Sequence, residues 1–209
     1  MKIRPAMTRG HLQAGWIESR RTFSNNSYWD PLYMNWGNLR VINDDVQQPG
    51  NMVPNHEHKN YDILGYMVEG ELEHTDSLGN TARARPGQIQ HMWCGSSIWH
   101  TESSVGAIPA RYLQLWITPK QQYVDTAPYY EIIDKDLNFG PIIVDLKQDM
   151  QISAGVLTNT ITTTNSYLYI VSGTCTVNDV ELHQGDGAEL DSATIIPINS
   201  PHLLLFENH

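Results

Sequence analysis

The stretch ILGYMVEGELEHTDSLGNTARAR, residues 63–85, decides the fold class of this chain. Its first part, Ile63–Glu69, is rich in aliphatic and aromatic residues and stops at a glycine, which is typical of a strand. The residues Ser77-Leu78-Gly79-Asn80 predict a turn between Leu72–Thr75 and Thr81–Arg85, because Ser, Gly and Asn favour turn conformations. The stretch therefore predicts antiparallel strands rather than a helix.

Most of the remaining sequence has the same character. No segment shows helical periodicity over ten or more residues, and the best candidate for a helix, Pro119–Tyr123, is short. Many short strands bounded by Gly, Pro, Asn, Asp or Ser indicate a β-sandwich or a β-barrel. The further strands that we expect are Leu39–Ile42, Ile89–Trp93, Tyr112–Ile117, Val156–Thr162, Tyr167–Val171, Cys175–Val177 and Leu203–Phe206.

A faint internal repeat divides the chain. The pattern of Gly65–Gly70 returns at Leu168–Gly173, and each copy is followed by a glycine turn, at Gly87 and at Gly185. This repetition favours two tandem barrels over one large sandwich. We expect an all-β protein with jelly-roll-like barrels at 1–120 and 141–209, the second one shorter. The segment 121–140 is rich in Pro, Tyr and Asp and is expected to be a linker.

The composition excludes several classes of protein. The 209 residues include 13 Lys and Arg against 23 Asp and Glu, a formal net charge of -10. This acidic balance argues against direct binding to nucleic acids or to anionic membranes, which both require basic surfaces. The two cysteines, Cys94 and Cys175, are far apart and predict no disulfide framework. Without a secretory signal or an apolar run of about 20 residues, a cytoplasmic protein is expected.

Two pairs of residues are the candidate metal ligands of this chain. His56 and His58 are two positions apart, as are His100 and Glu102, so the members of each pair share one face of a strand. Three imidazoles and a carboxylate form a mixed nitrogen and oxygen set that suits Fe(II), Ni(II), Mn(II), Co(II), Cu(II) or Zn(II), and disfavours Ca²⁺ and Mg²⁺. Four ligands leave two positions of an octahedral ion open for water, oxygen or a substrate. We expect a metal site here rather than a metal-free barrel interior.

The spacing of these residues resembles the two motifs of the cupin family. The first motif has the form G-x5-H-x-H, starting at Gly50, and another glycine follows twelve residues after His58. The second motif ends with His100. This chain departs from the cupin pattern at Trp93, which replaces the usual proline, and at Asp62, which replaces the usual glutamate of the first motif.

Within the cupins, the chain resembles the pirin family, including the bacterial pirin-like quercetinases. The resemblance is dense over roughly the first 120 residues and looser beyond them. It implies a bicupin fold whose N-terminal barrel holds a metal, usually iron, through His56, His58, His100 and Glu102, and whose second barrel has lost its metal. The stretches that carry it are GWIESRRTFS (15–24), LRVINDD (39–45), HEH (56–58), GELEHTDSLGN (70–80) and IWHTE (98–102).

The resemblance leaves two functions open. The first is a dioxygenase that opens the heterocyclic ring of a flavonol with O2, with Glu102 as the catalytic residue that accepts the proton of the substrate's 3-hydroxyl. The second is an iron-binding redox sensor that contacts protein partners without turnover. We favour the enzyme. A roomy, apolar, open pocket over the metal would support it, whereas a sealed metal beside a flat acidic patch would support the sensor.

The remaining histidines receive structural interpretations. His74 is expected to form a hydrogen bond within its hairpin, and the facing of His91 is left open between the pocket and the outside. Counting back from Gly173 by the offsets that join Gly70 to the first histidine pair gives Asn159 and Ile161, which are unsuitable ligands. The second barrel is therefore expected to be metal-free. The histidines expected at the surface or at strand edges are His11, His183, His202 and His209.

Overall fold

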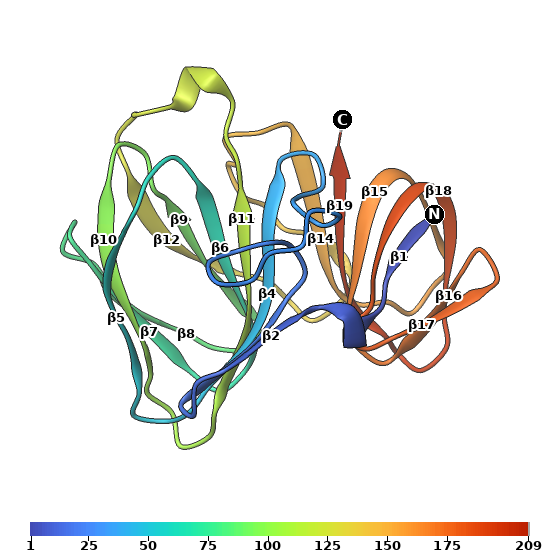
Figure 1. The fold of residues 1–209 in the computed structure, drawn as a ribbon, viewed down its shortest axis with the longest axis horizontal. Coiled ribbons are helices and arrows are strands. Elements are labelled where there is room, and N and C mark those ends of the chain that lie inside the picture. The colour runs from blue at the N-terminus through green and yellow to red at the C-terminus, as the bar shows by residue number, and fades with distance from the viewer. Residues whose placement is uncertain (209) are drawn as a thin grey trace. The chain divides into compact units, whose positions relative to one another are not determined.

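The computed structural model describes residues 1–208, which form two compact units built almost entirely of strands (Figure 1). The N-terminal unit comprises Gly10–Lys135 together with Val144–Gln148. The C-terminal unit comprises Met1–Arg9, Asp136–Ile143 and the chain from Asp149 onward. The two units are thus not consecutive segments of the sequence. The all-β, two-barrel fold class expected from the sequence is confirmed.

The N-terminal unit contains two antiparallel sheets. The larger sheet has, in spatial order, β12 (Tyr129–Asp134), β9 (Gln88–Trp93), β6 (Asp62–Glu69), β11 (Ala110–Ile117), β4 (Leu39–Gln47), β3 (Ile17–Arg21) and β2 (Gly10–Gln13). The smaller sheet has β5 (Met52–His58), β10 (Ile98–Ser104), β7 (Leu72–Asp76) and β8 (Thr81–Ala84).

Burial explains why the central strands of the larger sheet read as apolar runs. Six consecutive residues of β6, from Asp62 to Met67, are buried, and Leu113 and Leu115 of β11 are completely inaccessible. The smaller sheet alternates instead. In β10, the side chains of Ile98, His100 and Glu102 are buried while those between them are exposed or half-buried. The period of two along a strand therefore turns His100 and Glu102 to the same, inner face.

The C-terminal unit is built on one sheet with the order β13 (Gly140–Pro141), β14 (Met150–Val156), β19 (His202–Asn208), β15 (Ile161–Ser172), β18 (Gly187–Pro197), β16 (Thr174–Val177) and β17 (Val180–His183). The N-terminal strand β1 (Lys2–Arg4) also pairs with β18. The core consists of aliphatic residues with one cysteine, and Leu168, Ile170 and Leu203 are completely buried in it. This core gives the unit a hydrophobic interior of its own.

Two local expectations have different outcomes. The strand expected over Val156–Thr162 is wrong, because β14 ends at Val156 and β15 begins only at Ile161. Between them the amide of Leu157 donates to the carbonyl of Pro201, and a connection occupies the position where a strand was predicted. The short helix expected near residue 120 is confirmed as the 3-10 helix η2 (Gln121–Tyr123), while η1 (Ala6–Thr8) was not expected.

The segment 121–140 is largely structured. It contains η2 and then β12, which pairs with β9 along its whole length, from Tyr129 opposite Trp93 to Asp134 opposite Gln88. Within residues 1–208, no helix has the length and apolar character required to span a membrane.

Candidate metal centre

The pairing of β5 with β10 brings together the two sequence motifs. The strands are antiparallel, and His100 lies directly opposite His56 in their register. On β5, His56 and His58 are half-buried while the intervening Glu57 is exposed, as the alternation of a strand requires. The register shifts between His100 and Glu102, which marks an irregularity of the β-bulge type next to the site. Bulges commonly re-aim side chains in this way.

Three imidazoles converge at this point. The Nε2 atoms of His56 and His100 are 3.1 Å apart. The ring centroid of His58 lies 4.7 Å from that of His56 and 5.1 Å from that of His100. One nitrogen from each ring can be chosen so that all three lie within 4.8 Å of one another. This cluster of three histidines is compact enough to share one ion.

Hydrogen bonding shows which nitrogen of His56 is available. Its Nδ1 lies 2.8 Å from the carbonyl oxygen of Pro54, which can only accept, so Nδ1 carries the hydrogen and Nε2 presents a lone pair. That lone pair faces Nε2 of His100. Bonds of about 2.1 Å from an ion to two nitrogens at right angles would separate those nitrogens by about 3.0 Å. The observed spacing therefore fits two neighbouring ligands of one transition metal.

The protonation states also fit a metal site. Burial, with a contribution from the neighbouring His56, lowers the pKa of His58 to about 4. Burial likewise lowers the pKa of His100 to about 2, with contributions from the surrounding histidines. Both rings are therefore neutral at neutral pH, and the neutral imidazole is the form that binds metals.

Glu102 lies beside the cluster in a buried position, only 5% exposed. Its carboxylate is close enough to His100 and His74 for these three side chains to hold one ion, and His56, His58 and His100 form a separate group of this kind. Burial, together with the nearby charge of Asp45, raises the pKa of Glu102 to about 7, although a hydrogen bond from Gln114 opposes this rise. The four residues expected as ligands thus lie in one region, with His100 common to both groups.

Gln114 fixes the position of the Glu102 carboxylate. The indole Nε1 of Trp116 donates to Oε1 of Gln114 at 3.1 Å, which orients the amide. The Nε2 of Gln114 then donates to Oε2 of Glu102 at 3.2 Å. This pair of hydrogen bonds holds one oxygen of the carboxylate and leaves Oε1 available.

A cavity of about 430 Å³ opens onto the cluster. Its volume lies within the range of small-molecule sites. Its walls are mixed rather than purely apolar, and two buried acceptors, Asn43 Oδ1 and Asp45 Oδ1, have no hydrogen-bond partner within the described residues. The lining residues include His56, His58, Glu102, Ser19, Arg21, Asn43, Asp45, Tyr112, Gln114 and Trp116.

Asp45 is a site residue that sequence reasoning missed. It is 5% exposed, and burial raises the pKa of its carboxyl to about 7, with the Asp44 charge adding to the rise and Ser19 and Arg21 opposing it. The signal was present in the LRVINDD stretch, where consecutive polar residues interrupt an apolar strand. In β4 these residues are buried, and a buried carboxyl in a strand is rare without a function or a partner.

His91, whose facing was left open, does not line the cavity. It is completely buried, with Nε2 at 3.0 Å from Asp62 and Nδ1 at 2.9 Å from Glu131. Asp62 also accepts a hydrogen bond from the backbone amide of Lys147. This arrangement gives His91 a structural role, in which two carboxylates hold one imidazole.

His74 forms the hydrogen bond within its hairpin that the sequence predicted, to Asp76 at 2.9 Å. Its Nδ1 also lies 3.3 Å from Nδ1 of His100, a contact that was not expected. Its ring stacks on Tyr130 at 3.9 Å. The i, i+2 spacing of His74 and Asp76 was visible in the sequence, but their contact with His100 depends on strand pairing that the sequence does not show.

The other described histidines do not belong to a group of residues able to hold an ion. His11 contacts Glu18, and His183 contacts Glu181, both at exposed positions. His209 lies outside the described residues. In the described part of the chain, the groups of donors able to hold an ion all belong to the N-terminal unit, and Asn159 is an exposed residue bonded to Thr158.

Fold and site together define the class of the molecule. A chain with two all-β units, one of which carries a histidine cluster on neighbouring strands, has the bicupin fold. The sequence profile named Pirin matches residues 2–117, and the profile of the quercetinase C-terminal cupin domain matches residues 142–207. The chain belongs to the pirin family, which confirms the resemblance.

Individual relatives agree with this assignment. The quercetin 2,3-dioxygenase of Escherichia coli (strain K12) is 32% identical, over 98% of this chain and 97% of that protein. A pirin-like protein of Caulobacter vibrioides is 30% identical, over 91% of this chain and 90% of its own length. Among solved structures, the nickel(II) complex of the bacterial pirin YhhW from Escherichia coli superimposes with a TM-score of 0.92 at 30% identity, covering 99% of this chain and 97% of that one.

Proposed function

We propose that this protein is a metal-dependent dioxygenase that cleaves the heterocyclic ring of a flavonol with O2. The observation that carries the proposal is the cavity of about 430 Å³ that opens on His56, His58 and Glu102. A sensor needs no space for a substrate beside its metal, whereas an enzyme does. The full-length similarity to the quercetin 2,3-dioxygenase of Escherichia coli supports a flavonol as the substrate class.

The proposed metal ligands are His56, His58, His100 and Glu102, holding one divalent ion. Neutral imidazoles with converging lone pairs and a buried carboxylate fit Fe(II), which is our first expectation, and also Ni(II), which the related YhhW binds. When bound, the ion would supply Lewis acidity toward a substrate hydroxyl and redox chemistry with O2. The C-terminal unit is proposed to be metal-free and to contribute packing.

The chain's own residues would bind the substrate and accept its proton. Glu102 would receive the proton of the 3-hydroxyl, and the hydrogen bond from Gln114 would hold its carboxylate in position for this. The unpartnered acceptors of Asn43 and Asp45 would take hydrogen bonds from further hydroxyls of a polyhydroxylated ring system. Trp116 offers an aromatic wall, since it packs edge-on against His58.

Turnover of quercetin under air tests this proposal. Protein loaded separately with Fe(II), Ni(II), Mn(II), Co(II) and Cu(II) should consume quercetin and O2 and release carbon monoxide in at least one form. The variant carrying both His56→Ala and His58→Ala is the control for free-metal chemistry. A fully loaded protein without turnover in any form would instead support the iron-binding sensor, and pull-down partners that depend on oxidation state would then be sought.

A further inference from the structure

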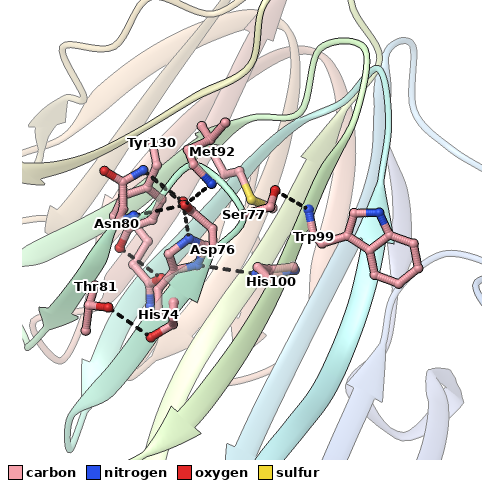
Figure 2. A network of polar contacts seen from close by, with 12 residues as sticks. His74, Asp76, Ser77, Asn80, Thr81, Met92, Trp99, His100 and Tyr130 are labelled. Atoms are coloured by element: carbon pink, nitrogen blue, oxygen red, sulfur yellow. Dashed lines mark hydrogen bonds and ion pairs between the residues drawn. The ribbon is translucent and has the colours of Figure 1, made fainter.

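We propose that His74 and Asp76 are positioning residues for the metal centre, which fix the ring of His100 so that its Nε2 lone pair points at the ligand cluster. The inference rests on the proposed metal site, and it concerns binding of the ion rather than turnover. Figure 2 shows the network, in which Asp76, His74 and His100 follow one another across two neighbouring strands.

Strand pairing builds this arrangement. β7 lies beside β10 in the smaller sheet, with Asp76 opposite His100 and His74 opposite Glu102. His74 and Asp76 are two positions apart, so both side chains lie on the same face of β7. That face is buried, because His74 is 1% and Asp76 is 9% exposed. A buried histidine and a buried carboxylate therefore stand directly behind a proposed metal ligand.

Asp76 is held as an ionised acceptor. Its Oδ1 accepts the backbone amides of Leu78 at 2.9 Å and of Asn80 at 3.1 Å, and the Asn80 side-chain amide lies 3.0 Å from Oδ2. Burial opposes ionisation, but these hydrogen bonds and the one from His74 outweigh it and lower the pKa of Asp76. The hairpin turn thus presents a carboxylate to the next residue of the network.

The carboxylate sets the tautomer of His74. Oδ2 of Asp76 lies 2.9 Å from Nε2 of His74 and can only accept, so Nε2 carries the hydrogen. The ring is 1% exposed and stacks on Tyr130 at an interplanar angle of 3°, which fixes its orientation. In the neutral ring, Nδ1 is then the acceptor.

We call the chain of hydrogen bonds from Asp76 through His74 to His100 the relay. It ends at the Nε2 lone pair of His100. The two Nδ1 atoms of His74 and His100 are 3.3 Å apart, and since that of His74 accepts, that of His100 donates. Nε2 of His100 is then free of hydrogen, and it faces Nε2 of His56. Outer partners of this kind orient histidine ligands and raise their basicity.

His74 is also close enough to His100 and Glu102 for these three side chains to hold one ion, which makes it an alternative metal ligand. Both of its ring nitrogens are already engaged, one by Asp76 and one by His100. Tyr130 further fixes its ring plane, because the phenol bonds to Gln90 while its ring stacks on the imidazole. The geometry therefore favours a supporting role over direct coordination.

The substitution Asp76→Asn tests the relay, because the structure dictates how the new amide points. Two backbone N–H groups donate to the Oδ1 position, so the amide oxygen occupies it and the NH2 group faces Nε2 of His74. A donor there reverses the network, puts the hydrogen of His100 on Nε2 and blocks that nitrogen. We expect affinity for Ni(II) to fall about 10–100-fold, the usual loss on removing such a partner.

Asp186→Asn is the matched control. Asp186 also accepts backbone amides in a turn, from Ala6 at 2.8 Å and from His183 at 2.9 Å, but it lies in the C-terminal unit and supports no proposed ligand. Its Ni(II) affinity should stay within about twofold of the parent protein. A folded Asp76→Asn protein with unchanged affinity would overturn the inference.

A second readout uses the metal-free protein and needs no variant. Nitrogen chemical shifts of ¹⁵N-labelled histidine distinguish the two neutral tautomers, and we expect His100 to carry its hydrogen on Nδ1. A hydrogen on Nε2 of His100 in the parent protein would contradict the relay even if Asp76→Asn failed to fold. Neither readout involves turnover, so absence of flavonol cleavage would refute the proposed function and leave this inference standing.

Discussion

Nε2 of His56 lies 3.1 Å from Nε2 of His100, although 44 residues separate the two histidines in the sequence. The hydrogen bond of His56 to Pro54 makes its Nε2 an acceptor, and the proposed relay does the same for His100. Two lone pairs directed at each other across 3.1 Å repel, and a metal cation between them would turn that repulsion into attraction. The site is therefore arranged around a positive charge, and the predictions below follow from that arrangement.

Removing the histidines of β5 should abolish metal binding. We expect His56→Ala and His58→Ala, separately or together, to lose stoichiometric Fe(II) or Ni(II) at neutral pH, because each removes one of three convergent imidazoles. Elemental analysis after gel filtration measures the loss. Substitution of His183 and His202 by Ala in the C-terminal unit is the matched control and should leave the metal content unchanged. Full metal content in the double β5 variant would place the site elsewhere.

Glu102→Gln should separate binding from chemistry. The amide keeps the size of the side chain and an oxygen donor, but it cannot accept a substrate proton. We expect much of the metal to remain while flavonol cleavage falls roughly 10²–10⁴-fold, the range for loss of a general base. Glu73→Gln, at a half-buried position paired with Arg83, is the control. Equal rates for Glu102→Gln and the parent protein would remove Glu102 from the catalytic step.

Asp45→Asn should weaken recognition of the substrate without loss of metal. Asp45 lines the cavity, and its Oδ1 has no partner within the described residues. Burial raises the pKa of Asp45 to about 7, so the assay is run above that pH, where the carboxylate is ionised. Hydrogen bonds to a charged acceptor exceed those to a neutral one by about 1 kcal/mol or more. We therefore expect kcat/KM for quercetin to fall about tenfold or more. Asp134→Asn, at an exposed carboxylate bonded to Gln88, should have no effect. An unchanged kcat/KM for Asp45→Asn would show that Asp45 does not accept a hydrogen bond from the substrate.

The glycine that connects β6 to β7 should be intolerant of a side chain. Gly70 has a φ of +72°, and a Cβ atom there would lie 2.5 Å from the carbonyl oxygen of Pro109. Gly50 has a similar φ of +74° with open space around it. Left-handed backbone costs a non-glycine residue about 1–2 kcal/mol. We expect Gly50→Ala to lose about that much, and Gly70→Ala to lose a further 1–3 kcal/mol or so from the overlap. Urea unfolding measures both, and equal losses would contradict the packing argument.

The fold class could be predicted because its signals are local. Apolar runs and glycine turns each occupy only a few residues of sequence. The pattern that ends at Gly70 returns at Gly173, and in the structure both glycines have positive φ values and follow the end of a strand. The error at Val156–Thr162 has a physical cause. A run rich in Val, Ile and Thr does not distinguish a strand from a connection. Leu157 is buried while its amide bonds to Pro201 rather than to a strand partner, and Thr158, Asn159 and Thr160 after it are exposed.

The candidate site was only partly visible in the sequence. The i, i+2 pairs at His56 and His100 depend on strand alternation, which is a local property. The contribution of His74 depends instead on the pairing of β7 with β10, and that of Asp45 on which polar residues of β4 face the cavity. Both are set by long-range register, which one sequence does not reveal. The register shift between His100 and Glu102 is a product of the same pairing.

The most direct measurement is carbon monoxide released per quercetin consumed under air, with the protein loaded to one metal ion per chain. The account predicts a ratio of about one in at least one metal form, at a rate above that of the same metal free in solution. It also predicts that the variant with His56→Ala and His58→Ala falls to that background. A fully loaded protein that leaves quercetin intact and releases no carbon monoxide in any metal form would contradict the dioxygenase assignment.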